Sequence, residues 1–472
     1  MKQPILVAIL STTLAVPVLS HAETIKDWLM QSQVSGDIRS YYFNQLYGGS
    51  PLPDKYAYSL GGMLRVQTAP VYGISAAVAF YTANDLGAND TGGGQSHLDP
   101  LLMGDRTSLN VLGQAYLQYQ DPWVQLRVGN LLLDTPWMNP SDAFMIPSTF
   151  QAVAIRVTPI KNLQIIGIRE FRFKNRIQAD YQRQTLLNIN DHYSYLPDNS
   201  IGTLAFGLKG HLMGVHASAW FYRFYSLTNM FYGTLGYTTP TLLGHFRPFA
   251  DFQYAREWAN GAQLAGPVNA TVYGGMAGIQ GDFDGVTGQI FAAYDQIPSR
   301  AVTLANGQTL YNGGFISPYT QQYSADPLYT SIMDYGLVDA SASGHAWKFG
   351  FLLHPLRQVR IKYSYSMYDT APYLPNVDAN YLDVTYSPGG FWKGLSLRNR
   401  LALDHSNPYG GYHGTFIDDR LMLQYRFSLE VYRFGGCQAA DGILPGLGPD
   451  RIRVAAKMDR GWGCPGHCPS PW

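Results

Sequence analysis

The stretch VRIKYSYS, residues 359–366, decides the fold. Apolar or aromatic side chains occupy its odd positions, and charged or hydroxyl side chains occupy its even positions. Successive side chains of a β-strand point to opposite faces, so this alternation predicts a strand with one apolar face and one wet face. The same period of two recurs at residues 59–66, 125–128, 152–157 and 395–404. We therefore expect an all-β protein.

The connections between these strands alternate between short and long. Short connections are expected at residues 69–71, 120–122, 159–161, 210–212, 241–244, 282–285, 355–358 and 387–394. Long connections are expected at residues 81–107, 131–149, 174–198 and 295–344. A strand on each side of every short connection, with one more at each chain end, gives 18 strands. Both chain ends then lie on the short-turn side.

This segregation of loop lengths is typical of bacterial outer-membrane barrels. A bilayer offers no water to backbone groups, and a closed barrel pairs all of them internally. We therefore predict a transmembrane antiparallel β-barrel of about 18 strands. The alternative is a soluble sandwich or propeller, whose loops would not segregate by length.

The composition agrees with a chain that faces lipid. Only 14% of the 472 residues are charged, whereas an ordinary soluble domain has about 25%. A Lys or Arg on the lipid face at mid-membrane costs about 2–4 kcal/mol, so the remaining charges are expected in loops or in the lumen. The 33 basic and 33 acidic residues cancel without a basic run, which argues against a nucleic-acid partner.

The first 22 residues read as a cleavable secretory signal. Lys2 precedes an apolar stretch, residues 5–18, and a small-x-small site ends at Ala22. A membrane anchor is the alternative. We therefore expect a signal peptide at 1–22, cleaved near Ala22, a barrel at 23–434 and an atypical extension at 435–472.

The extension contains every cysteine of the chain, Cys437, Cys464 and Cys468. It shows no alternation beyond Phe434, and we interpret it as a disordered periplasmic segment or as read-through of a displaced stop codon. A disulfide, or a metal site that includes His467, stays an alternative. We predict no cofactor and no metal for the barrel.

Three stretches carry a resemblance to a known family. LLLDTPWMNPSDAFMIPSTFQ, residues 131–151, resembles the third-loop segment of OprD-type outer-membrane porins. GDIRSYYFNQLYG from Gly36 and HFRPFADFQYAREWANG from His245 are similar to other parts of that family. The resemblance covers about residues 34–434. It implies an 18-stranded barrel whose third extracellular loop folds inward, and a channel that favours carboxylate-bearing or amino-acid-like solutes along a basic wall.

The candidate pore residues come from this resemblance and from strand parity. The resemblance implies a constriction loop from Asp134 to Ser148, with Asp134 and Asp142 as its charges and with Arg127 and Arg156 beside it. If the apolar parity faces lipid, the other basic residues of the lumen wall include Arg39, Arg65, Arg360, Lys362, Arg398 and Arg400, with Arg420 and Arg426 on the same parity. The alternative for each arginine is a structural pairing with a neighbouring Asp, Glu or Tyr.

We therefore predict an outer-membrane porin for passive or facilitated diffusion of small hydrophilic solutes. Its expected partners are outer-membrane lipid, lipopolysaccharide, the transported solutes and the outer-membrane insertion machinery. The sequence has no H-E-x-x-H, G-x-S-x-G or P-loop motif, so we expect that the protein is not an enzyme. A surface adhesin or structural outer-membrane protein, with the 295–344 loop as its binding surface, is the alternative.

Overall fold

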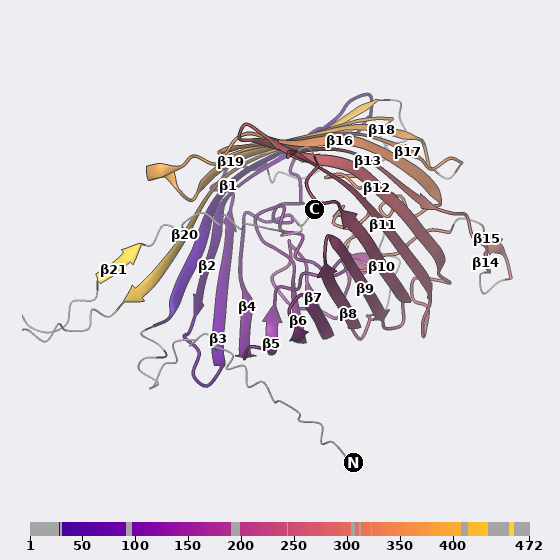
Figure 1. The fold of residues 1–472 in the computed structure, drawn as a ribbon. Coiled ribbons are helices and arrows are strands. Elements are labelled where there is room, and N and C mark those ends of the chain that lie inside the picture. The colour runs from indigo at the N-terminus through magenta and orange to yellow at the C-terminus, as the bar shows by residue number, and fades with distance from the viewer. Residues whose placement is uncertain are drawn as a thin grey trace, which may run out of the picture.

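The protein forms a closed antiparallel β-barrel (Figure 1). The computed structural model describes residues 28, 31–90, 97–189, 199–242, 244–303, 307–310, 313–321, 323–372, 374–406, 414–432 and 453–456. Each barrel strand pairs with the next, and the last pairs with the first. The main sheet has 19 strands, of which 18 close the barrel and the remaining one, β21 (Arg453–Ala456), pairs with the end of β20. The predicted antiparallel barrel of 18 strands is thereby confirmed.

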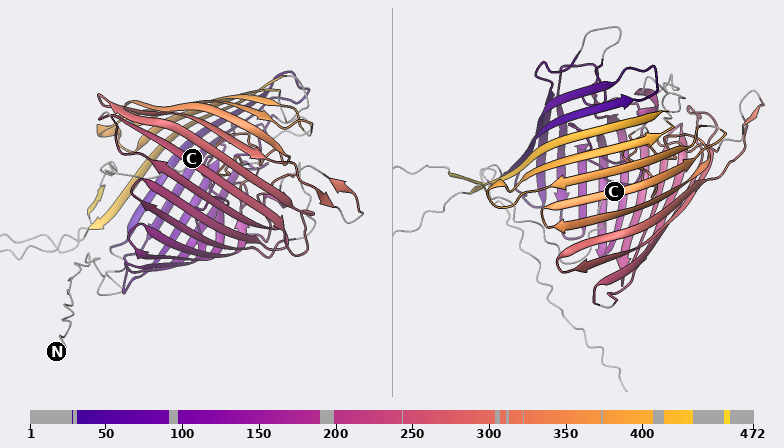
Figure 2. Two further views of the ribbon diagram at one scale, coloured as in Figure 1. Left: turned by 45° about the vertical axis from the view of Figure 1, so that its right-hand side comes forward. Right: turned by 90° about the horizontal axis from the view of Figure 1, so that it is seen from above.

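In chain order the barrel strands are β1 (Gln33–Tyr47), β2 (Lys55–Gln67), β3 (Ile74–Asn84), β4 (Ser108–Gln120), β5 (Val124–Leu131), β6 (Thr149–Ile160), β7 (Leu163–Lys174), β8 (Thr203–Leu212), β9 (Val215–Phe224), β10 (Thr228–Thr238), β11 (Phe246–Ala259), β12 (Asn269–Phe283), β13 (Val286–Ile297), β16 (Gly344–Leu356), β17 (Val359–Asp369), β18 (Val377–Tyr386), β19 (Leu395–His405) and β20 (Thr415–Tyr432). The strands are strongly tilted (Figure 2). Between β13 and β16 the short hairpin of β14 (Val302–Thr303) and β15 (Thr309–Leu310) projects away from the barrel. The described residues also include α2 (Leu186–Ile189) and η1 (Gly390–Trp392).

The two rims of the barrel differ as the sequence predicts. One rim carries short turns together with the start of β1 and the end of β20, where Gln33 pairs with Glu430. The other rim carries the long connections L2 (85–107), L3 (132–148), L4 (175–202) and L7 (298–343). One turn prediction was wrong. Residues 210–212 belong to β8, and the turn follows at Met213 and Gly214.

Local backbone chemistry explains why several short turns form where they do. Asp284 and Gly285 connect β12 to β13 with φ values of 51° and 82°. Two consecutive residues with positive φ are the requirement of a type I′ hairpin, which glycine and aspartate meet most easily. Met213 and Gly214 connect β8 to β9 in the same way, with φ values of 50° and 85°. In this turn the second residue, Gly214, is common at positive φ, whereas the first residue, Met213, is not.

The strands alternate as predicted between an apolar outer face and a buried or polar inner face. Leu64, Val128 and Ile155 are 49%, 46% and 40% exposed on the outer surface. On the neighbouring parity of the same sheet, Ser59 and Ala152 are buried. The apolar parity therefore covers the outside of the barrel, and the inward parity carries the charges discussed below.

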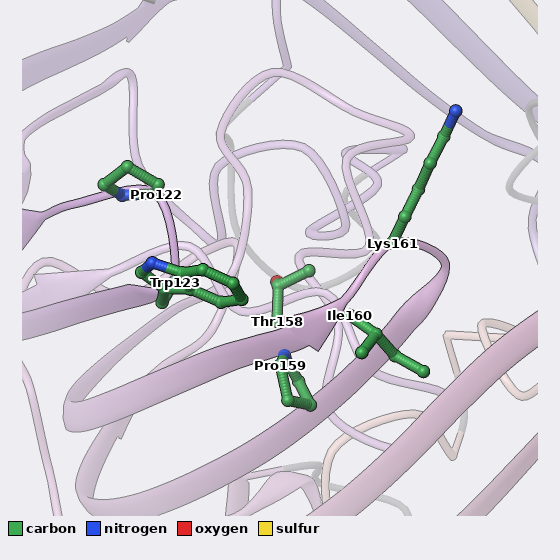
Figure 3. Close-up of a pocket in the computed structure, with 6 residues that line it drawn as sticks. All are labelled: Pro122, Trp123, Thr158, Pro159, Ile160 and Lys161. Carbon is green, nitrogen blue, oxygen red and sulfur yellow. The ribbon is translucent and has the colours of Figure 1, made fainter. Parts of the chain in front are cut away.

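Aromatic side chains gather at the short-turn rim. Trp123, in the turn between β4 and β5, is 55% exposed, and Phe391 and Trp392 project from the turn between β18 and β19. Figure 3 shows Trp123 beside Thr158 and Pro159, in a surface hollow of about 380 Å³, with the Lys161 side chain directed away from the indole. Rings at this height are typical of the aromatic girdles of membrane barrels. This hollow lies outside the lumen and contributes nothing to the candidate pore.

Several sequence predictions concern residues outside the described part of the chain. They include the signal peptide at 1–22, the barrel boundary at Phe434, and the three cysteines with His467. Among the described residues, no helix combines the length and the hydropathy that crossing a membrane would require.

Candidate functional site: the charged lumen

Four of the predicted basic residues form a cluster on β17 and β19. Arg360 and Lys362 lie on β17, and Arg398 and Arg400 lie on β19, all on the inward parity. The strand between them, β18, contributes Asp383, whose register neighbours are Lys362 and Arg400. The closed sheet therefore brings together residues that are up to 40 positions apart in the sequence.

Asp383 is the carboxylate at the centre of this cluster. It accepts hydrogen bonds from Arg398 Nε at 2.9 Å and Nη2 at 2.7 Å, and from Arg360 Nη1 at 3.3 Å. Arg400 Nε donates instead to the Tyr381 hydroxyl at 3.0 Å, and Lys362 lies 5.5 Å from the centre of the same ring. Four cations thus surround one carboxylate, and the cluster keeps a surplus of positive charge. We call these five charged residues the basic wall.

The remaining basic residues of the prediction are spread along the lumen. Arg65 donates to the Tyr116 hydroxyl at 2.7 Å, and Arg127 stacks 5.6 Å from the centre of that ring. Arg156 is exposed on β6. These three lie on the inward parity but away from the basic wall, on β2, β5 and β6.

Arg39 has a different environment, because it is paired and buried. Its guanidinium is 5% exposed and donates to Asp37 of its own strand. It also donates to both carboxylate oxygens of Asp142, at 2.6 and 3.0 Å, and to the Phe144 carbonyl at 2.7 Å. Arg39 therefore ties L3 to β1. Asp134, the other predicted charge of L3, is exposed.

L3 also contacts the barrel far from β1. Trp137 is fully buried, with its ring 5.7 Å from that of Tyr232 on β10 and 5.0 Å from that of Phe315 in L7. β1 and β10 are separated by eight strands in either direction around the barrel. L3 thus contacts buried side chains on two strands that lie on opposite sides of the barrel.

L7 is anchored to the inner wall by buried carboxylates. Glu170 of β7 accepts from the Tyr319 hydroxyl at 2.9 Å, and Glu257 of β11 accepts from the Ile316 backbone amide at 2.9 Å. Asp295 of β13 accepts from both the amide and the hydroxyl of one residue, Thr330, at 2.7 and 2.8 Å. A buried carboxylate is tolerated when hydrogen bonds satisfy its oxygens, and here L7 supplies those bonds.

Apolar packing holds the same loop. Phe315, Leu337 and Val338 are fully buried in the core cluster that also contains Trp137 of L3. The 295–344 segment was the candidate binding surface of the adhesin alternative. Much of its described part is buried against the barrel wall instead, so this part of the segment offers little surface to an external partner.

A small cavity of about 50 Å³ lies where L3, L7 and β20 meet. Its lining includes Phe144 of L3, Asp334 of L7, and Asp418 and Arg420 of β20. Burial raises the pKa of the Asp334 carboxyl to about 7, and the nearby Asp418 adds to the effect, whereas Arg420 opposes it. Asp334 is therefore more easily protonated than a solvent-exposed aspartate, at the point where the loops meet the wall.

Parity identified the lumen-facing basic residues, but it missed their acidic partners. Asp383 lies on the inward parity of β18, so the same test applied to acidic residues would have found it. The carboxylates that anchor L7 carry no sequence signal that separates them from other strand residues. Within the described part of the chain, no three His, Cys, Asp or Glu side chains are grouped as a metal site.

Solved structures that resemble this barrel include porins of the Occ and Opd groups, which are OprD-type. Pseudomonas aeruginosa OccK9 (OpdG) superposes with a TM-score of 0.68 at 16% identity, covering 85% of this chain and 100% of that chain. Acinetobacter baumannii OccAB2 superposes with a TM-score of 0.67 at 15% identity, covering 85% of this chain and 99% of that chain. Pseudomonas aeruginosa OpdK, solved with vanillate, superposes with a TM-score of 0.65 at 14% identity, covering 85% of this chain and 100% of that chain.

At these identities the likeness establishes a shared fold. No protein-family model matches the sequence, and no curated protein matches it. The resemblance found in the sequence is thus confirmed at the level of the OprD-type barrel architecture.

Proposed function

We propose that this protein is an outer-membrane porin that lets small hydrophilic solutes diffuse through its lumen. The chain would reach the outer membrane after cleavage near Ala22 and with the help of the insertion machinery. The apolar outer face would contact lipid, and the long-loop rim would face lipopolysaccharide and the exterior. The observation that carries the proposal is the basic wall on β17–β19 of a closed barrel, and the contacts of L3 and L7 with the barrel wall support it.

In this function L3 and L7 narrow the lumen between them. The contacts of L3 with Arg39 and Tyr232, and the anchoring of L7 by Asp295, support a constriction built from both loops. Rings and rows of charge at a constriction select ions by sign, while weak binding keeps the solute moving. Surplus positive charge at the wall favours anionic solutes.

The substrate class we propose is small carboxylates, including amino-acid-like molecules. Arginine presents a planar fork of donors that matches a carboxylate, and the basic wall contains three arginines close together. The likeness to OpdK, solved with vanillate, supports the same class, because vanillate is a carboxylate. These arginines would bind a solute carboxylate only weakly, because two of them already donate hydrogen bonds to Asp383.

Planar-bilayer recording of the purified protein tests the channel itself. We expect discrete conductance steps, with a preference for anions over cations in a salt gradient. Benzoate-type carboxylates added to one side should reduce the open-channel current as they pass the basic wall. A folded, inserted barrel without conductance steps would contradict the proposed function.

The charge of the basic wall should set ion selectivity. Arg398→Ala removes one of the four cations, and we expect the anion-to-cation permeability ratio to fall by about two-fold or more. Asp383→Asn removes the carboxylate, and the ratio should rise by a similar factor. Reversal potentials in a salt gradient measure both changes. Lys161→Ala, outside the lumen, is the matched control. Equal permeability ratios in the wild type and in all three variants would rule out the basic wall as the element that sets ion selectivity.

A further inference from the structure

We propose that Arg176 is a positioning residue of the pore. Its guanidinium lies between the Phe144 ring of L3 and the Tyr323 ring of L7 and joins L3, L4 and L7 into one rim. Through this contact Arg176 would set the width of the channel. The inference rests on the proposed porin function and deepens it.

The contact joins three loops through a single side chain. Arg176 belongs to L4, and its Cζ lies 4.0 Å from the centre of the Phe144 ring and 3.5 Å from the centre of the Tyr323 ring. Its Nη1 donates to the Ser141 hydroxyl of L3 at 3.4 Å. A cation over an aromatic face is attracted by the ring's negative face, and more strongly where water is excluded. Arg176 is 2% exposed, so water is excluded here.

The rings compensate a charge that no carboxylate neutralises. Among the described residues, none of the ion pairs includes Arg176, and its Nε has no hydrogen-bond partner. Burial lowers the pKa of the Arg176 guanidinium to about 10, so the side chain stays charged at neutral pH. An isolated buried charge is costly, so separation of either ring from this guanidinium would be unfavourable. That cost keeps Tyr323 of L7 beside Phe144 of L3.

The same column of side chains reaches the barrel wall. Arg420 of β20 lies on Phe144 with its Cζ 4.7 Å from the ring centre, and Tyr41 of β1 stacks on Phe144 at 5.7 Å. L7 is thus connected through Arg176 to L3, and through Phe144 to the wall. Loss of the guanidinium would separate Tyr323 of L7 from Phe144 of L3 at this point. The two loops would keep their other contact, between Trp137 and Phe315, and their anchors at Arg39 and Asp295.

Single-channel recording and liposome swelling of the full-length protein test this inference. We expect Arg176→Ala to raise the conductance by about two-fold and to admit larger sugars, because the cross-section of the constriction increases. Tyr323→Leu should have the same effect. The conductance of the double variant should not exceed that of either single variant. Both substitutions break the same contact, so their effects are not additive. Arg176→Lys keeps a cation and should recover part of the wild-type conductance.

Arg183→Ala, an exposed arginine of the same loop, is the matched control and should behave as wild type. A heat-modifiability gel shows whether each variant folds. If Arg176→Ala folds and keeps the wild-type conductance and size limit, the inference is wrong. It is also wrong if the effects of Arg176→Ala and Tyr323→Leu on the conductance add in the double variant. If Arg176→Ala does not fold, Tyr323→Leu and Arg176→Lys decide by the same readouts. Absence of channels in the wild-type protein would instead contradict the porin proposal.

Discussion

Arg39→Ala should release L3 from the barrel wall and destabilise the protein. The guanidinium of Arg39 donates to both oxygens of Asp37, to both oxygens of Asp142 and to the Phe144 carbonyl. Its loss leaves Asp37, which is 7% exposed, as a buried carboxylate without its main partner. Breaking a buried ion pair costs about 3–5 kcal/mol, but Asp142 is 40% exposed and solvent weakens that half of the interaction. We expect the free energy of unfolding to fall by about 3 kcal/mol.

Urea unfolding of the refolded protein in lipid vesicles measures this change. Arg426→Ala is the matched control, since Arg426 lies on the inward parity of the neighbouring strand and is exposed, and we expect a change within about 0.5 kcal/mol. Adding Asp37→Asn to Arg39→Ala should restore part of the lost stability, because it removes the unpaired charge. A single variant as stable as wild type would show that the tether contributes nothing.

Asp295→Asn should loosen the part of L7 around Thr330 from the wall and increase the conductance. Both oxygens of Asp295 accept hydrogen bonds, one from Gln253 Nε2 at 2.6 Å and the other from the amide and the hydroxyl of Thr330. An asparagine has one acceptor oxygen, so its NH₂ group would face one of these donors. Gln253 cannot turn its amide without loss, because its Oε1 already accepts from the Tyr232 hydroxyl.

The buried donors left unpaired should cost about 2–3 kcal/mol, which is enough to loosen L7 around Thr330. We expect a larger and noisier single-channel current, and faster cleavage of L7 by an added protease. Asp282→Asn, an exposed carboxylate at the end of β12, is the matched control. Unchanged current together with unchanged protease resistance would show that other anchors, such as Glu257 and Glu170, hold L7 without Asp295.

Local features of the sequence were sufficient for the barrel and its two faces. The alternation in VRIKYSYS assigns Arg360 and Lys362 to the lumen, and the Asp284–Gly285 pair predicts a hairpin turn at its observed place. Both signals involve residues within a few positions of each other, where side-chain direction and backbone φ follow from covalent geometry. The turn at Met213 was predicted too early because methionine is not a usual residue with positive φ.

The candidate site was only partly predictable. Parity placed Arg39 in the lumen but could not show that Asp142, 103 residues away, would neutralise it. Nor could it show that much of the described part of the 295–344 segment, rich in Tyr, Gly and Ser, would pack against the barrel wall while the β14–β15 hairpin projects away from it. Arg176 is in a loop, where parity has no meaning, and its contacts come from two other loops.

By itself, then, the sequence determined that this protein is an 18-stranded barrel with an apolar outer face and a basic inner one. Strand direction, turn chemistry and hydropathy are properties of neighbouring residues, so they can be read along the chain. Only the tertiary structure decided which charges remain available to a solute and which are used to hold L3 and L7. Closure of the sheet brings distant strands and loops together around one lumen, and the balance between desolvation and pairing at each charge depends on that arrangement.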